Sequence, residues 1–405
     1  MAYFVGIFSL WLIISAATAL RPGRRGIFGA IAWPVGWAAG ELPFQAILLQ
    51  MGLLGLLWWW GWPRTHWLSV SVGAAALVVT TLNALLLVTL FYSRRIVRKS
   101  MMNNALPLVT GKPRDDAYGS WWRTALQIPY HARDIVITKN VSYAQHERNV
   151  LDVWRMTTTP SNAPVMIYFH GGSWVFGDKK DQGRPMLHEM VKRGWIVVTA
   201  NYRLAPKDPW PAQIEDATRV LYWVKKNIAT YGGDPSRVVV SGGSAGGHLA
   251  SLVALSTDDE TWRPVDASGV TDWSVRGCVS YYGVLEMTGD EEYWHGRGKG
   301  LMYLLENRVV QKKYKENVAL YEALSPRHRV REDSPPFLVI QGGNDTLVDV
   351  NVARGFVRHY ESVAVAPIYY LEMPFAQHTF DLTASPRTSA VTRAVVAFAN
   401  SVVNY

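Results

Sequence analysis

Cysteine is almost absent from this chain, which has only Cys278 among its 405 residues. A single cysteine excludes an intramolecular disulfide, and with it the small secreted folds that depend on a disulfide framework. Cys278 lies in a strand-like apolar run, so we interpret it as a buried core residue. The sequence also lacks metal-ligand spacings and dinucleotide-binding fingerprints, so we expect no metal and no other cofactor.

Charged residues are also scarce, because Asp, Glu, Lys and Arg make up only 18% of the chain. The net charge of +9 is unevenly spread. Residues 1–132 hold 11 basic and 3 acidic residues, a net +8, and residues 133–405 therefore carry the remaining +1. Basic charge beside apolar segments favours anionic lipid as a partner, and no nucleic-acid motif accompanies it. We expect a lipid bilayer as a partner and no nucleic acid.

Long apolar segments, by contrast, fill the first 92 residues. The best candidates to span a membrane are Tyr3–Leu20, roughly Leu42–Trp60, and Trp67–Tyr92. A helix needs about 20 apolar residues to cross a bilayer, so we predict an all-α transmembrane region of about three helices over residues 1–93. The stretch 26–40 is interpreted as a broken helix start or an interfacial segment. A cleavable signal peptide is the alternative for the first segment, since residues 17–19 resemble a cleavage site; no basic residue precedes that segment, however, and two more apolar segments follow.

Basic residues show which side of the membrane the rest of the chain occupies. They follow the first segment as Arg21, Arg24 and Arg25, and the third as Arg94, Arg95, Arg98 and Lys99. With three spans both clusters lie on one side, which the positive-inside rule makes the cytoplasm. We therefore predict a multi-pass integral membrane protein with its globular domain on the cytoplasmic side. A two-span hairpin over residues 27–62 would place the first cluster outside, against the rule.

The pattern becomes globular in residues 133–405. Strands are predicted at 134–138, 150–154, 165–169, 196–200, 238–240, 279–282, 337–340 and 368–371, and helices at 185–193, 212–231, 245–255, 352–360 and 386–402. Such alternation is typical of an α/β fold with a mostly parallel sheet covered on both faces. Residues 94–132 read as a basic connector that can contribute to a cap. Residues 287–326 interrupt the alternation and are interpreted as an insertion over the site.

The strongest chemical signal is Gly-x-Ser-x-Gly at residues 242–246, with Ser244 at its centre. A β-branched strand precedes it and a helix-forming segment follows, which is the strand–turn–helix context of a nucleophile elbow. The turn is strained, so small residues must flank the serine and let the backbone pass close to its neighbours. The competing interpretation is a glycine-rich turn with an incidental serine. We predict Ser244 as a nucleophile at a helix N-terminus, where backbone N–H groups favour negative charge.

A second glycine-rich loop follows the strand at 165–169. In this loop, backbone N–H groups can turn toward a developing oxyanion, and glycine is needed where side chains would crowd the substrate. The predicted oxyanion-hole residues are Gly171, Gly172, Ser173 and Ala245. His170 is interpreted as a residue that shapes this loop.

A serine nucleophile needs a base, and the base needs a carboxylate to orient it. His378 follows the predicted strand at 368–371, and Asp345 follows the strand at 337–340. Both therefore fall at strand C-terminal ends, where open α/β sheets place their sites. Asp349 is the rival acid, interpreted as a helix cap, and His248 is interpreted as a supporting residue.

Several motifs together resemble the hormone-sensitive-lipase-like branch of the α/β-hydrolases, which includes acetyl esterases, arylacetamide deacetylase and prenylcysteine methylesterase-like proteins. They are residues 170–174 (HGGSW), 201–206 (NYRLAP), 232–235 (GGDP), 243–247 (GSAGG), 345–349 (DTLVD) and 378–380 (HTF). The resemblance implies an eight-stranded α/β-hydrolase fold with a cap, a triad of Ser244, Asp345 and His378, and the loop after His170 as half of the oxyanion hole. This chain departs at Ser173, where a third glycine is usual; a backbone N–H remains, and the side chain is expected to narrow the acyl pocket.

These features predict a membrane-anchored serine carboxylesterase that cleaves a small-molecule or lipid ester. The alternative within catalysis is acyl transfer or deacetylation on a lipid or sugar, using the same triad. A more remote alternative is a binding protein with a hydrolase fold and no activity. Neither the natural ester nor the oligomeric state follows from the sequence.

Overall fold

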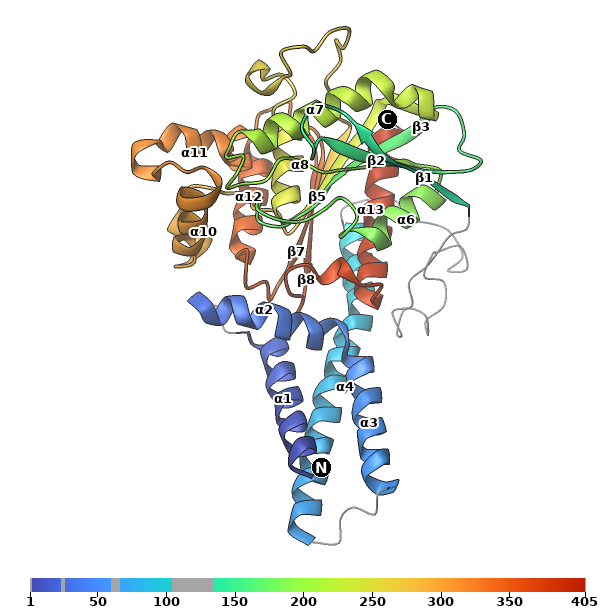
Figure 1. Cartoon of the computed structure of the whole chain (residues 1–405), viewed down its shortest axis with the longest axis vertical. Coiled ribbons are helices and arrows are strands. Elements are labelled where there is room, and N and C mark those ends of the chain that lie inside the picture. Colours follow the sequence, from blue (N-terminus) through green and yellow to red (C-terminus); the bar gives the residue numbers. More distant parts are fainter. Residues whose placement is uncertain (1, 23–25, 60–65, 104–133, 405) are drawn as a thin grey trace.

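The computed structural model describes residues 2–22, 26–59, 66–103 and 134–404. Within them, eight strands form a single sheet at the positions that the sequence predicts. The strands are β1 Ile135–Ser142, β2 Val150–Met156, β3 Ala163–Phe169, β4 Ile196–Ala200, β5 Gly233–Gly243, β6 Gly277–Tyr281, β7 Phe337–Gly342 and β8 Ile368–Met373. Helices cover both faces of this sheet, so the predicted α/β fold is confirmed (Figure 1).

The strands follow the order β1-β2-β4-β3-β5-β6-β7-β8. The β1–β2 and β2–β4 pairs are antiparallel, whereas every pair from β4 through β3 to β8 is parallel. Parallel neighbours end at the same edge of a sheet. The loops that follow β3, β5, β7 and β8 therefore meet at one edge, as in other open α/β sheets.

Alternation along the strands divides the core into two layers. On β3, Val165, Ile167 and Phe169 point into one buried cluster, and Met166 and Tyr168 into the other. The first layer is covered by α7 Ala212–Asn227, α8 Ala245–Leu255 and α12 Val350–Val363, and the second by α6 Arg184–Lys192 and α13 Pro386–Val403. Successive side chains of a strand point to opposite faces of the sheet. Because both faces are buried, the strands are apolar almost throughout.

Between β6 and β7 the chain leaves the sheet, in the region predicted as an insertion. It forms short helices, α9 Glu291–Trp294, α10 Gly298–Leu304 and α11 Val318–Leu324, with a π-helical turn at Leu305–Val309. In Figure 1 these helices project from one end of the sheet.

Four helices precede the sheet within the described residues: α1 Ala2–Leu20, α2 Gly26–Glu41, α3 Pro43–Trp59 and α4 His66–Asn103. Figure 1 shows α1, α3 and α4 side by side, with α2 lying across their ends between them and the sheet. The chain bends by 80° between Ile31–Glu41 and Pro43–Leu56, which separates α2 from α3. Arg24, Arg25 and residues 60–65 lie outside the described residues.

By length and composition, one described helix can cross a membrane, Gly73–Met102. A second is added if the bent pair of α2 and α3 counts as one span. In α1, the apolar stretch Leu10–Leu20 is shorter than the length of such a span.

The predicted boundary at residue 93 falls inside α4, which continues to Asn103. The helix continues because Val97 and Met101 are buried in the same core cluster as Trp154 and Phe398. Residues 94–103 therefore extend this helix past the predicted boundary and join the N-terminal helices to the sheet. The rest of the predicted connector, 104–132, lies outside the described residues.

Candidate active site

Ser244 occupies a sharp turn between β5 and α8, as the sequence predicts. Its backbone has φ 57° and ψ −121°, a region that non-glycine residues enter only when the surroundings enforce it. The neighbouring glycines show what enforces it. A Cβ on Gly246 would come within 2.0 Å of Phe169 O, and one on Gly242 within 2.3 Å of Gly246 O. The turn holds the Ser244 hydroxyl at the carboxyl edge of the sheet.

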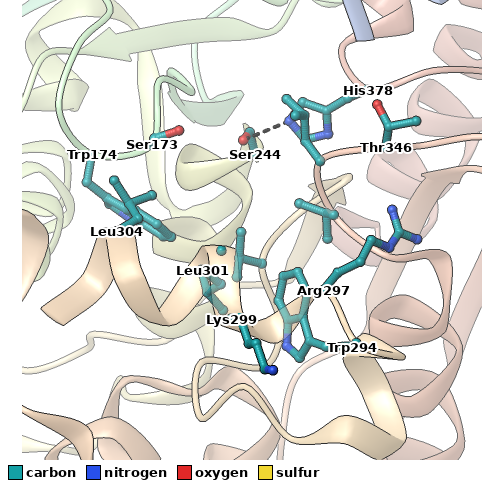
Figure 2. A pocket seen from close by; sticks show the side chains of 15 residues that line it. Ser173, Trp174, Ser244, Trp294, Arg297, Lys299, Leu301, Leu304, Thr346 and His378 are labelled. Atoms are coloured by element: carbon teal, nitrogen blue, oxygen red, sulfur yellow. Dashed lines mark hydrogen bonds between the residues drawn. The ribbon is translucent and has the colours of Figure 1, made fainter. Parts of the chain in front are cut away.

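The loops after β7 and β8 bring the other two predicted residues to this serine. His378 Nε2 lies 2.9 Å from Ser244 Oγ, and His378 Nδ1 lies 2.7 Å from Asp345 Oδ2. Asp345 is itself fixed, because Oδ1 accepts hydrogen bonds of 2.9 Å from the backbone N–H groups of Leu347 and Val348. Asp345, His378 and Ser244 therefore form one continuous chain of hydrogen bonds, and Figure 2 shows its link between His378 and Ser244.

The rival acid Asp349 and the supporting residue His248 have other contacts in the structure. Asp349 caps α12 by accepting a hydrogen bond of 3.0 Å from the Asn351 N–H, and it forms an ion pair with Arg297. His248 is buried in α8, where Nδ1 accepts a hydrogen bond of 3.2 Å from Trp174 Nε1 and Nε2 lies 2.8 Å from Leu324 O. Burial lowers the pKa of His248 to about 4, so it is neutral at physiological pH.

The glycine-rich loop lies beside Ser244, but its N–H groups are not equivalent. The Gly171 N–H donates to Gln182 Oε1 at 2.7 Å, so the prediction of Gly171 as an oxyanion donor does not fit this geometry. Gly172 has φ 124°, Ser173 has φ 52° and Trp174 has φ 60°, a tight left-handed run. The Ala245 N–H opens α8 and has no acceptor within its own helix. Gly172, Ser173 and Ala245 remain as candidate donors.

His170 contacts this loop and stabilises its conformation. Its ring stacks on Tyr202 with centroids 4.4 Å apart, and Nδ1 lies 2.7 Å from Gly171 O. The Tyr202 hydroxyl in turn donates to His170 O at 2.8 Å. Burial lowers the pKa of His170 to about 4, so a neutral ring donates from Nδ1 to Gly171 O.

A cavity of about 530 Å³ opens above Ser244 and His378 (Figure 2). Trp174 and Ser173 form one wall, and the helices between β6 and β7 form the other. Its remaining lining residues are Val284, Trp294, Gly296, Arg297, Lys299, Gly300, Leu301, Leu304, Thr346, Leu347 and Val348. Most of these side chains are apolar, which suits an acyl chain or another uncharged group beside the reacting ester.

The sequence did not reveal several residues that the structure places around the site. Gln341 Nε2 donates to Asp345 Oδ2 at 2.9 Å, and Gln377 Oε1 lies 3.2 Å from both the Thr346 and His378 N–H groups. Tyr282 packs on the His378 ring and donates to the buried Asp381, whose pKa is raised by burial. Their positions beside the predicted acid and base were the only available signal.

Known proteins similar to this chain include several esterases. The family model BD-FAE matches residues 151–359. The chain is 34% identical to a probable carboxylic ester hydrolase, LipM, of Mycobacterium tuberculosis, over 97% of this chain and 92% of that protein. It is 38% identical to the esterase LipQ of the same organism, over 66% of this chain and 63% of that protein. The similarity to LipM extends over nearly the whole chain, and so includes N-terminal helices.

Solved structures share the fold at lower identity. A truncated carbohydrate esterase from gut microbiota aligns with a TM-score of 0.57 and 21% identity, over 68% of this chain and 99% of that one. An inhibited esterase B from Lactobacillus rhamnosis aligns with a TM-score of 0.57 and 20% identity, over 77% and 97%. The chain therefore belongs to the BD-FAE family, within the hormone-sensitive-lipase-like branch of the α/β-hydrolases, and is a carboxylic-ester hydrolase.

Proposed function

We propose that this chain is a membrane-anchored serine carboxylesterase that works through an acyl-enzyme on Ser244. One observation carries the mechanism, namely the uninterrupted contact from Asp345 through His378 to Ser244, at 2.7 and 2.9 Å, at the base of a cavity. A serine hydroxyl becomes a useful nucleophile when an oriented histidine can take its proton.

In the proposed reaction, Ser244 Oγ attacks the acyl carbon while His378 Nε2 takes the hydroxyl proton. Asp345 holds the ring so that Nδ1 donates to it and stabilises the imidazolium that forms. The oxyanion accepts hydrogen bonds from the N–H groups of Gly172, Ser173 and Ala245. The ester C–O bond then breaks, and the alcohol leaves with the proton from His378. Water activated by the same histidine releases the acid and restores Ser244.

Purified full-length protein tests this mechanism with a p-nitrophenyl ester. Ser244→Ala should abolish both turnover and labelling by a fluorophosphonate probe, whereas the wild type should show both. Unchanged hydrolysis by Ser244→Ala would disprove the mechanism. Product analysis in the presence of an alcohol acceptor separates hydrolysis from acyl transfer, since transfer yields a new ester in place of the free acid.

The substrate is proposed to be a small-molecule or lipid ester. Leu301, Leu304 and Trp294 give the cavity an apolar wall, while Lys299 lies at its exposed margin. The proposed ester therefore places its apolar part against α10. Activity against acyl chains of increasing length, compared in detergent and in lipid nanodiscs, tests whether the substrate is taken from a membrane.

Membrane anchoring is proposed from the surface of the N-terminal helices. Large apolar side chains are exposed on all three aligned helices, among them Trp11 on α1, Trp58 on α3 and Leu77 on α4. Gln50 is buried between α3 and α4, where its Nε2 donates a hydrogen bond to Ala76 O at 2.8 Å. Lipid offers no hydrogen bonds, so this division of polar and apolar groups suits a bilayer.

The catalytic domain is proposed to lie on the cytoplasmic side. Arg21 follows α1, and Arg94, Arg95 and Arg98 lie in the part of α4 nearest the sheet, so basic residues gather on the side of the hydrolase domain. Since Cys278 is buried, a Glu147→Cys variant at an exposed site gives a clean probe. An impermeant maleimide should label it only after permeabilisation, and labelling of intact cells would reverse the proposed orientation.

A further inference from the structure

The face of α2 that is turned toward the sheet carries Trp33, Gly36, Trp37 and Gly40. Their spacing of three, four and seven residues places them on one side of a helix. This side lies along the loop from Phe375 to Thr379, which carries the candidate base. A Cβ on Gly40 would lie 3.8 Å from Phe375 O, and one on Gly36 would lie 3.2 Å from Gln377 Nε2. Trp33 reaches His378 and Thr379, and Trp37 reaches Thr379.

Both indoles donate hydrogen bonds to this loop. Trp33 Nε1 donates to His378 O at 3.0 Å and to Thr379 Oγ1 at 3.2 Å, and Trp37 Nε1 donates to Thr379 O at 3.1 Å. The Trp33 and His378 rings also meet edge to face, with centroids 6.5 Å apart. The backbone of the catalytic histidine is therefore held by side chains from the N-terminal helices.

The loop needs such support because its backbone is strained. Phe375 and Thr379 both have φ 57°, a left-handed conformation that costs non-glycine residues about 1 kcal/mol or more unless neighbours stabilise it. The indole N–H groups of Trp33 and Trp37 bind the carbonyl oxygens of two consecutive residues, His378 and Thr379. They stabilise the conformation that directs the His378 ring at Ser244.

The loop of the candidate acid is tied to the same helices. Asn344, next to Asp345, donates through Nδ2 to Ala19 O at 2.7 Å, and this carbonyl at the end of α1 has no acceptor role within its own helix. A Cβ on Gly36 would lie 3.2 Å from Gln377 Nε2. Because Gln377 Oε1 is bonded to both Thr346 and His378, it cannot move aside without shifting the acid and base loops.

We propose that Trp33 and Trp37 are positioning residues for His378, and that α2 is thereby a working part of the active site rather than only a membrane anchor. The inference rests on the proposed function of His378 as the base. Displacing a catalytic group by about 1 Å can cost a hundredfold in rate, so hydrogen bonds to the carbonyl of His378 and to that of the next residue are significant for turnover. The two indoles touch the loop and not the cavity, so they act on the base rather than on substrate binding.

The test uses the full-length protein with Trp33→Phe, Trp37→Phe and the double substitution, which remove the N–H donors and keep aromatic rings. Trp58→Phe is the matched control, because Trp58 is 83% exposed on α3. The rate of p-nitrophenyl butyrate hydrolysis is divided by the concentration of active sites. This concentration is measured as the amount of Ser244 that a fluorophosphonate labels at completion, so unfolded molecules do not contribute to it. Each single substitution should lower kcat about five- to tenfold, as expected for the loss of one indole N–H donor, with KM within twofold of wild type.

A second test leaves both indoles in place. Gly36→Ala adds one methyl group against Gln377 and should also lower kcat at unchanged KM, whereas Gly55→Ala, which has open space around its Cβ, should not. An unchanged kcat in the double tryptophan variant or in Gly36→Ala would overturn the proposal, as would an equal loss in the Trp58→Phe control. A wild-type protein that neither hydrolyses the ester nor labels would instead overturn the proposed function.

Discussion

The carboxylate of Asp349 pairs with Arg297 and is thereby held away from the base. Arg297 Nε lies 2.8 Å from Asp349 Oδ2, and Arg297 Nη1 donates to Asp345 O at 3.0 Å. The arginine comes from the segment between β6 and β7, so it joins that segment to the loop of the candidate acid. Two aspartates four residues apart are thus separated in role, one facing His378 and one facing Arg297.

This separation predicts different outcomes for two matched substitutions. Asp345→Asn keeps the shape of the side chain but cannot stabilise the imidazolium, so kcat should fall about 10⁴-fold. Asp349→Asn leaves Arg297 buried without its counter-ion, which should cost about 3 kcal/mol of stability and leave kcat per labelled Ser244 within a few fold of wild type. Ester turnover and thermal unfolding measure both effects. A loss of turnover in a well-folded Asp349→Asn protein would move the role of acid to that residue.

The oxyanion loop gives a second prediction, at Gly172. A Cβ there would lie 2.0 Å from Phe176 O, and the backbone has φ 124°, so alanine fits neither the space nor the conformation. Gly172→Ala should displace the N–H groups of the loop and lower kcat by 10²- to 10³-fold, the usual consequence of a lost oxyanion donor. Gly52→Ala on α3, with nothing near its Cβ, is the control. Equal kcat values in the two variants would place the oxyanion hole elsewhere.

The fold and the candidate triad were predictable because their signals are local. Most strands are short runs rich in β-branched or aromatic residues, and Ser244 sits in a motif whose strand–turn–helix context is visible in the sequence. Asp345 and His378 follow strands, and parallel strands bring their ends together. Sequence position alone therefore placed these three residues at one edge of the sheet.

The support around the triad was not predictable in the same way. Trp33 lies 345 residues before His378, and no local pattern indicates which surface an apolar helix will contact. The apolar stretch before α3 is interpreted from the sequence as a broken helix start or an interfacial segment, and the structure forms a separate helix, α2, across the ends of the others. Glu41 interrupts this stretch because it is buried against Arg387, a partner 346 residues away. Contacts between residues so far apart in the sequence produce no periodic pattern in it, so they cannot be predicted from it.

Two buried histidines predict how stability depends on pH. Burial lowers the pKa of His170 and of His248 from about 6.5 to about 4. Above pH 6.5 both are neutral in the folded and the unfolded states. As the pH falls from 6.5 toward 4, the unfolded chain takes up protons that the folded protein does not, so folding loses stability. Each histidine should cost about 2 kcal/mol at pH 5 relative to pH 7.5.

Thermal unfolding at pH 7.5 and pH 5 measures this dependence. His248→Gln should shrink the difference between the two pH values by about 2 kcal/mol, even if it lowers stability at both. His295→Gln, at an exposed position, should leave the difference as in wild type. A difference that is equal in wild type and His248→Gln would mean that other groups govern acid sensitivity.

The buried carboxylate of Glu286 leads to a prediction about which acyl-chain lengths the cavity accepts. Its buried carboxylate accepts hydrogen bonds from Trp294 Nε1 at 2.7 Å and from the Thr288 N–H at 2.6 Å, and weaker ones from the next two N–H groups. Trp294 lines the cavity, so this carboxylate fixes the wall against which the substrate packs. In Glu286→Gln an amide NH₂ must replace one acceptor oxygen and face these donors, which should loosen the wall without touching Ser244 or His378. KM for longer acyl chains should rise several fold, while kcat for p-nitrophenyl acetate stays near wild type. Glu292→Gln is the matched control, because Glu292 is exposed on α9, the helix that carries Trp294. A uniform fall in kcat across all chain lengths would mean that Glu286 supports the whole active site rather than the wall alone.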